Sequence, residues 1–143
     1  MKSITLVLCL VLLSAAKMFG EDLDGRSAFL SAPGRDVGQA LKRAGEEKKR
    51  VMVFVVNTAK RHGGHIVGTM EVAETKQLVR DNFIVVIVTN PHEKHIAGLV
   101  DNVVEVHPAY VVFKPDGTVV EKGDAAMGGA NGLKWIQKLV ATP

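Results

Sequence analysis

Five histidines are the side chains of this 143-residue chain whose type and spacing suggest chemistry. Four of them form two His-x-x-His pairs and the fifth stands alone: His62, His65, His92, His95 and His107. Neutral imidazole is a good ligand for zinc, copper and nickel, so one interpretation is a transition-metal site made of histidines. The other interpretation is that these are ordinary solvated histidines in loops, because His-x-x-His alone fixes no ring in place.

The single cysteine lies near the N-terminus, within an apolar segment. Cys9 belongs to the run Ile4–Leu13, and small residues at 14–16 follow that run. This pattern is typical of a secretory signal peptide cleaved after Ala16, or as late as Gly20. The run is too short to span a bilayer as a mature helix, which needs about 20 residues. We therefore expect a secreted or periplasmic protein whose mature form has no thiol.

Charge and composition argue against two classes of function. The chain has 18 Lys and Arg against 15 Asp and Glu, a net charge of +3, with no basic block, so nucleic-acid binding has no support. A histidine-based enzyme would need a nucleophile or paired carboxylates beside the imidazoles. Ser27 and Ser31 lie in a polar N-terminal stretch, and Glu93 and Glu105 show no pairing pattern. We therefore rank such an enzyme below metal binding.

Two continuous apolar runs predict strands in the middle of a sheet: Val51–Val56 and Phe83–Thr89. A predicted helix over Glu71–Asn82 joins them, which favours a parallel pair with a right-handed crossover. Ala109–Lys114 predicts a third strand. The turn Pro115–Gly117 then returns the chain in an antiparallel hairpin.

Helical patterns flank these strands. Asp36 has the character of an N-cap for a first helix, and Ile96–Val103 has the spacing of a short helix. Asn131 is the expected cap of a last helix, with Trp135 beside its apolar stripe. The expected inward residues of that helix are Leu133, Ile136 and Val140. The element order predicts an α/β fold with three layers, α/β/α, around a mixed sheet.

This arrangement brings all five histidines to one edge of the sheet. Two pairs follow the carboxyl ends of the parallel strands, and the fifth precedes the third strand. Open α/β sheets commonly bind ligands at this edge. The candidate ligands for zinc or copper are His62, His65 and His107, and we expect His62 and His107 to be close neighbours. No other cofactor is expected.

Three stretches of sequence resemble the thioredoxin-like fold family. They are ALKRAGEEKKRVMVFVV, MEVAETKQLVRDNFIVVIV and, most specifically, VHPAYVVFKPDGTVV. The resemblance runs from Asp36 to the C-terminus and implies a thioredoxin-like domain. The third stretch is similar to the segment in which the family's proline is cis, so the resemblance implies a cis bond between His107 and Pro108.

The family's Cys-x-x-Cys motif has no counterpart in this chain. A gapless alignment, which we prefer, places Ala59-Lys60-Arg61-His62 at the motif. A shifted alignment places His62-Gly63-Gly64-His65 there instead. Because thiol–disulfide exchange requires a thiolate, we expect no oxidoreductase or isomerase activity.

The resemblance also implies a way of binding. Thioredoxin-like folds without redox activity keep a groove beside the cis-proline, where an extended peptide can pair with the backbone. The residues that would line the groove are Val106, His107, Pro108 and Ala109, with Lys60 and Arg61 as a positive rim.

We therefore predict an exported, redox-inactive domain that binds an unidentified protein or peptide, with the histidine metal site as the alternative. The predicted organisation is a signal peptide over residues 1–16, an N-terminal extension over 17–35 and a thioredoxin-like domain over 36–143. No membrane span is expected after cleavage of the signal peptide.

Overall fold

The computed structural model describes residues 25–26, 34–100, 107–125 and 129–143, so the predicted signal peptide lies outside the described residues. In chain order its elements are α2 (Val37–Glu47), β1 (Arg50–Val55), the 3-10 helix η2 (Thr58–Lys60), α3 (His62–Thr69), α4 (Ala73–Asn82), β2 (Phe83–Val88), β3 (Ala109–Phe113), β4 (Val119–Asp124) and α5 (Gly129–Ala141). No helix in this part of the chain is long and apolar enough to cross a membrane.

Four strands form one mixed sheet in the order β2-β1-β3-β4. β1 and β2 are parallel, whereas β3 is antiparallel to both β1 and β4, so the predicted parallel pair and hairpin are confirmed. Gly34 extends the sheet beyond β2: its N–H donates to Val85 at 2.9 Å, and its carbonyl accepts from Ile87 at 3.0 Å. Part of the stretch before the first helix therefore belongs to the folded domain.

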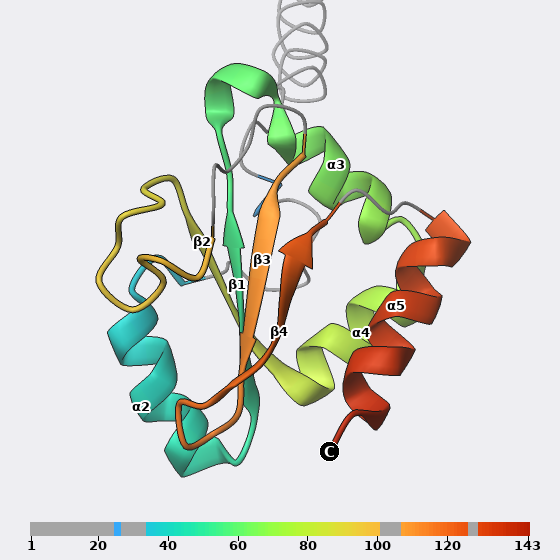
Figure 1. Ribbon diagram of the computed structural model, residues 1–143. Coiled ribbons are helices and arrows are strands. Elements are labelled where there is room, and N and C mark those ends of the chain that lie inside the picture. Colours follow the sequence, from blue (N-terminus) through green and yellow to red (C-terminus); the bar gives the residue numbers. More distant parts are fainter. Residues whose placement is uncertain (1–24, 27–33, 101–106, 126–128) are drawn as a thin grey trace, which may run out of the picture.

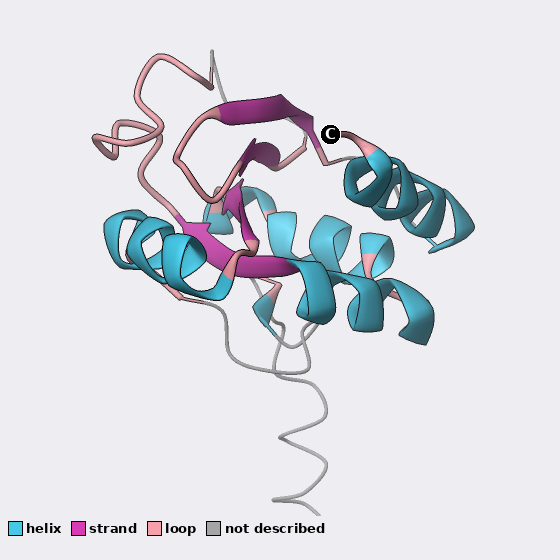
Figure 2. Cartoon of the chain, turned by 90° about the horizontal axis from the view of Figure 1, so that it is seen from below, coloured by secondary structure: helices cyan, strands magenta, loops and turns pink. Residues whose placement is uncertain are grey.

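Helices cover both faces of this sheet (Figure 1). Alternate residues of β1 point to opposite faces, as the strand period of two requires. Val51, Val53 and Val55 pack under α2, whereas Met52 and Phe54 pack under α3, α4 and α5. Figure 2 shows the strands from below, twisted and flanked by these helices. The three predicted layers are therefore present.

The first helix begins where the sequence predicts. The Asp36 side chain accepts a hydrogen bond of 2.9 Å from the backbone N–H of Gln39, which satisfies one of the free N–H groups of the first turn. At the other end Lys48 adopts a left-handed conformation with φ 56°. β1 then starts two residues later.

The last helix differs from its prediction. It begins at Gly129 rather than after Asn131, and Trp135 lies in the core, 4% exposed. The residues that are buried are Trp135, Ile136 and Leu139, whereas Leu133 and Val140 are half-buried. The reason lies at Gly132, because a Cβ there would be 2.1 Å from the carbonyl oxygen of Thr69. This contact with α3 sets how α5 is rotated.

Two further predictions are corrected. Residues 96–100 form turns rather than a helix, because Gly98 has a φ of +76°, and residues 101–103 lie outside the described part. The bond between His107 and Pro108 is trans, since no peptide bond in the described part of the chain is cis. Trans is the intrinsically favoured isomer of an X–Pro bond, by about 0.5–1 kcal/mol. The carbonyl of Pro108 accepts the N–H of Ala125 at 2.7 Å.

Candidate functional site

A short exposed loop follows β1 at its carboxyl end. Asn57 caps η2, because its Oδ1 accepts the N–H of Ala59 at 3.0 Å. Arg61 then adopts a left-handed conformation with φ 58°, which ends η2 and lets α3 start in a new direction. All four residues Thr58–Arg61 are exposed. The loop therefore presents two cationic side chains, Lys60 and Arg61, on a backbone that is capped on both sides.

His62 lies directly beneath this loop and is fully buried. Its Nδ1 accepts a hydrogen bond of 2.9 Å from the backbone N–H of Asn57. A ring whose Nδ1 accepts must carry its proton on Nε2, so the geometry selects the neutral Nε2–H tautomer. Burial lowers the pKa of His62, and the nearby His65, His107 and Lys60 lower that pKa further. Nε2 is buried and has no hydrogen-bond partner in the described part of the chain.

The structure brings together the three histidines that the sequence analysis selected. The ring of His65 lies between the other two, with its centroid 6.1 Å from that of His62 and 4.8 Å from that of His107. Both contacts are edge-to-face. Nδ1 of His107 is buried and, like Nε2 of His62, has no hydrogen-bond partner among the described residues.

The second His-x-x-His pair lies elsewhere. His92 is exposed, whereas both the N–H and the Nδ1 of His95 bind the carboxylate of Glu93, at 2.9 and 2.7 Å. Cε1 of His95 would lie 3.1 Å from a Cβ placed at Gly38, so this ring packs against the start of α2. These two histidines therefore belong to the loop after β2 and are not part of the cluster of His62, His65 and His107.

Within the described residues, no group of three or more His, Cys, Asp or Glu side chains is arranged to hold a metal ion. The hydrogen bond at His62 gives one physical reason. A neutral imidazole has one nitrogen lone pair to offer, and the N–H of Asn57 already occupies it. His62 could act as a ligand only by losing that bond or the proton on Nε2.

The expected counterpart of the Cys-x-x-Cys motif is divided between two helices. Ala59 and Lys60 belong to η2, Arg61 is left-handed, and His62 opens α3. His62 and His65 instead share the first turn of α3.

The predicted groove lies only partly within the described residues. Val106 is outside them. His107 is half-buried, and Pro108 and Ala109 are buried. Ala109 already pairs with Val55 on one side and Asp124 on the other. The backbone at the start of β3 is therefore already paired with the neighbouring strands of the sheet.

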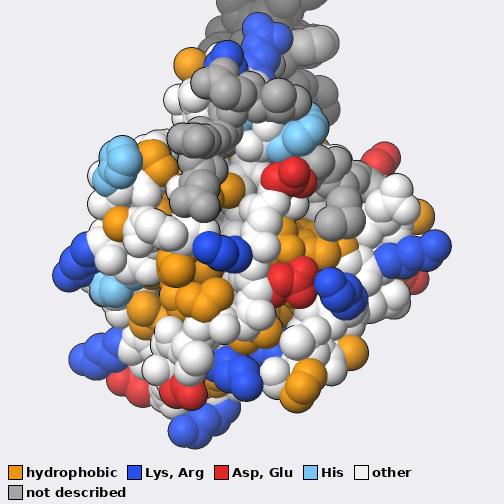
Figure 3. Space-filling model, in the orientation of Figure 1, with side chains coloured by type: hydrophobic (Ala, Val, Ile, Leu, Met, Phe, Trp, Pro, Cys, Tyr) orange, Lys and Arg blue, Asp and Glu red, His pale blue; other side chains and the backbone are white. Residues whose placement is uncertain are grey.

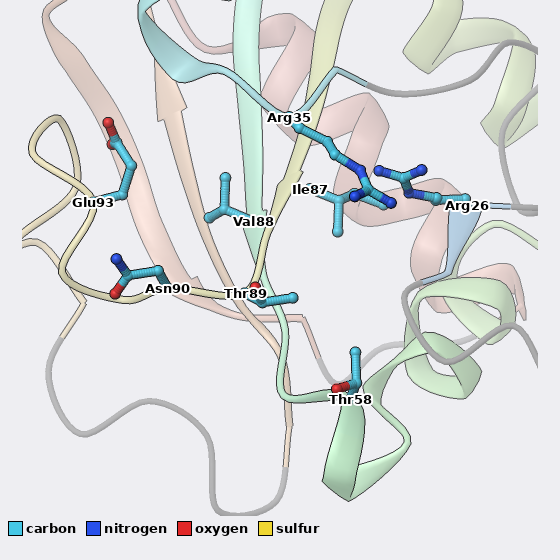
Figure 4. A pocket seen from close by; sticks show the side chains of 8 residues that line it. All are labelled: Arg26, Arg35, Thr58, Ile87, Val88, Thr89, Asn90 and Glu93. Carbon is cyan, nitrogen blue, oxygen red and sulfur yellow. The ribbon is translucent and has the colours of Figure 1, made fainter.

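A pocket at the carboxyl end of β2 was missed by the sequence analysis. Its volume is about 340 Å³, and it is lined by Arg26, Arg35, Thr58, Ile87, Val88, Thr89, Asn90 and Glu93. The side chains of Arg26 and Arg35 extend toward each other in this view (Figure 4). On the face shown in Figure 3, by contrast, Lys and Arg side chains are spread over the surface. Each of these two arginines follows a glycine, Gly25 or Gly34, and that repeat is the signal that could have found them.

Comparison with solved structures agrees with this architecture. The crystal structure of a disulphide isomerase from Xylella fastidiosa Temecula1 superposes with a TM-score of 0.60 and 17% sequence identity, covering 73% of this chain and 88% of that one. No protein-family model and no curated protein sequence matches the chain. The chain therefore has a thioredoxin-like fold, and at this identity the likeness extends to the fold alone. With one cysteine in the whole sequence, the chain cannot form an internal disulfide.

Proposed function

We propose that this protein is an exported, redox-inactive thioredoxin-like domain that binds a protein or peptide through the loop Thr58–Arg61. The observation that carries the proposal is His62. A buried, neutral imidazole opens the helix after β1, where the resemblance places a reactive thiol, and it is held there by Asn57. The position supports the loop and offers no nucleophilic sulfur.

The lack of redox activity follows from the chemistry of exchange. A disulfide is opened by attack of a thiolate on sulfur, and no other side chain replaces the thiolate in that step. The one cysteine, Cys9, belongs to the segment that we expect signal peptidase to remove. This segment is also the basis for assigning the protein to the periplasm or the extracellular space.

Binding through side chains is favoured over strand pairing. The bond before Pro108 is trans, and the backbone of Ala109 already pairs with neighbouring strands. Few backbone groups at the start of β3 are therefore left to form hydrogen bonds with a peptide. The loop after β1 is exposed and carries Lys60 and Arg61. A partner segment with acidic side chains complements that charge. Such complementarity speeds the encounter of the two molecules and fixes how the segment is aligned on the loop.

A zinc or copper site on the histidine cluster is the second candidate. The ring contacts that join His62, His65 and His107 favour it. The hydrogen bond on Nδ1 of His62 opposes it, because metal binding would require either the N–H of Asn57 to lose its acceptor or Nε2 to lose its proton. We therefore rank metal binding below peptide binding.

Photo-crosslinking tests the proposed binding surface. A benzophenone amino acid replaces Ala59 in the loop or, as a matched control, the exposed Ala73 at the start of α4. Each protein is irradiated with an array of short peptides of graded charge. We expect crosslinks to acidic peptides from position 59 and none from position 73. Equal crosslinking from both positions, or none from position 59, would refute the assignment of the loop.

A further inference from the structure

We propose that the pocket at the carboxyl end of β2 binds one apolar residue of the partner peptide, through the backbone carbonyl of Ile87 and the backbone N–H of Thr89. This inference rests on the proposed function and extends it to a second contact beside the loop Thr58–Arg61. Thr58 belongs to that loop and also lines the pocket, next to Thr89 (Figure 4). A peptide that lies on the loop therefore has the pocket within its reach.

β2 is the outer strand on its side of the sheet, and its outer edge is paired with Gly34. The N–H of Gly34 donates to the carbonyl of Val85 at 2.9 Å, and its carbonyl accepts from the N–H of Ile87 at 3.0 Å. One extended residue thus bridges a carbonyl and an N–H that are two residues apart on β2. This bridge shows what the outer edge of β2 can bind.

The next carbonyl and N–H along the same edge are open. The carbonyl of Ile87 points outward with its N–H, because both groups of one strand residue face the same neighbour. The carbonyl of Val88 accepts from the N–H of Val56 on β1 at 2.9 Å, so the N–H of Thr89, in the same planar trans peptide unit, points away from β1. Neither the carbonyl of Ile87 nor the N–H of Thr89 has a hydrogen-bond partner among the described residues.

The chain itself does not fill this second position. After Gly34 it turns into α2, where the carbonyl of Asp36 accepts the N–H of Ala40 at 3.1 Å. One residue of an extended peptide supplies the N–H and the carbonyl that Ile87 and Thr89 require, which is a short form of strand addition. At the start of β3, by contrast, the backbone is already paired.

The lining of the pocket indicates which side chain that residue carries. Ile87 and Val88 give the pocket an apolar part, and the exposed side chains of Thr58, Thr89 and Asn90 form a polar, uncharged rim. The volume of about 340 Å³ gives room for one side chain of moderate size. An aliphatic side chain gains most there, because it buries apolar surface. The occupant is therefore an aliphatic residue within the acidic segment that the loop binds.

Three peptides test this pocket in titrations of the whole purified chain, followed by amide NMR. The parent is acetyl-Asp-Glu-Asp-Leu-Ala-amide. In the second peptide serine replaces leucine, and in the third an ester oxygen replaces the N–H of leucine. The parent should bind about tenfold more tightly than the serine peptide, which lacks the apolar side chain. It should bind about fivefold more tightly than the ester, which cannot donate to Ile87. The parent should also shift the amide signal of Thr89.

Two variants separate the backbone N–H of Thr89 from its side chain. Thr89→Pro removes the N–H, whereas Thr89→Ala keeps it and removes the hydroxyl. Because this N–H has no partner among the described residues, its removal takes no hydrogen bond from them. Thr89→Pro should weaken binding of the parent peptide about fivefold, and Thr89→Ala by less than twofold. If Thr89→Pro fails to fold, the ester peptide tests the other hydrogen bond of the pair on the unaltered protein.

The outcomes distinguish the pocket from the loop. If all three peptides shift the signals of Thr58–Arg61 with equal affinity and the amide signal of Thr89 does not move, the pocket assignment is overturned and the loop assignment stands. If no peptide shifts the signals of Thr58–Arg61, both assignments are overturned.

Discussion

The backbone N–H of Asn57 donates a hydrogen bond of 2.9 Å to Nδ1 of His62. This bond ties the residue that follows the apolar run of β1 to the residue that opens α3. It also fixes the protonation of the ring, because an imidazolium would bring a second N–H toward that of Asn57. Neutral His62 is therefore part of the folded structure.

Stability should fall as pH falls below the ordinary histidine value. The pKa of His62 is lowered in the folded state, mainly by burial, whereas in the unfolded chain it is about 6.5. Between the lowered pKa and 6.5 the unfolded state binds more protons, so the free energy of unfolding decreases as pH drops through that window and is flat above it. Urea unfolding, followed by the fluorescence of the single tryptophan, measures this slope.

Two variants isolate that effect. His62→Gln keeps an acceptor for Asn57 but does not titrate, so the slope below pH about 6.5 should be shallower than in the wild type. His92→Gln makes the same change at an exposed histidine and should leave the slope as it is. An unchanged slope in His62→Gln would mean that His62 does not control the acid sensitivity.

Removing the ring altogether should be costly at any pH. His62→Ala leaves the N–H of Asn57 without its acceptor, a penalty of about 1–3 kcal/mol, and adds a cavity under the loop. His92→Ala, at the exposed surface, should change the free energy of unfolding by less than about 0.5 kcal/mol. Equal effects of the two substitutions in urea unfolding would contradict the structural role of His62.

Tyr110 should titrate far above an ordinary tyrosine. Burial, together with the hydrogen bond of 2.8 Å from its hydroxyl to Glu121, raises the pKa of Tyr110 to about 12. Tyr110 is the single tyrosine, so the ultraviolet absorbance of tyrosinate reports on it alone. Glu121→Gln should lower the midpoint, and denaturant should bring it to about 10. A midpoint near 10 in the folded protein would contradict this environment.

Two glycine-to-alanine substitutions should change the stability of the protein in opposite directions. Gly132→Ala places a Cβ 2.1 Å from the carbonyl oxygen of Thr69, so α3 and α5 must move apart, and the protein should be destabilised by about 1–3 kcal/mol. Gly64→Ala meets no atom within 4 Å and should stabilise α3 by about 0.5–1 kcal/mol. Thermal unfolding of both variants measures the contrast. A neutral Gly132→Ala would refute the close contact.

The sequence predicts the parts of the fold that depend on local pattern. The continuous apolar runs of β1 and β2 indicate buried central strands, and Asp36 marks the start of α2. The predicted strand directions also place His62, His65 and His107 at one edge of the sheet, because the direction of each strand decides at which edge its loops lie.

The parts that the sequence did not predict depend on contacts between distant residues. The rotation of α5 is set by Gly132 against Thr69, and the burial of Trp135 follows from it. The tautomer of His62 depends on one backbone N–H. Arg26 and Arg35 precede the predicted domain in sequence, and each follows a glycine that lies against the domain: Gly25 against Ile66 of α3, and Gly34 against β2.

Charge reversal at the loop tests the central claim most directly. The double variant Lys60→Glu, Arg61→Glu reverses the charge of the loop. The double variant Lys42→Glu, Arg43→Glu makes the same change of charge on the exposed face of α2. The affinity of each protein for acidic peptides is measured by amide NMR. The account predicts that peptides shift the signals of Thr58–Arg61 in the wild type and the α2 variant but not in the loop variant. Equal binding by all three proteins would contradict it.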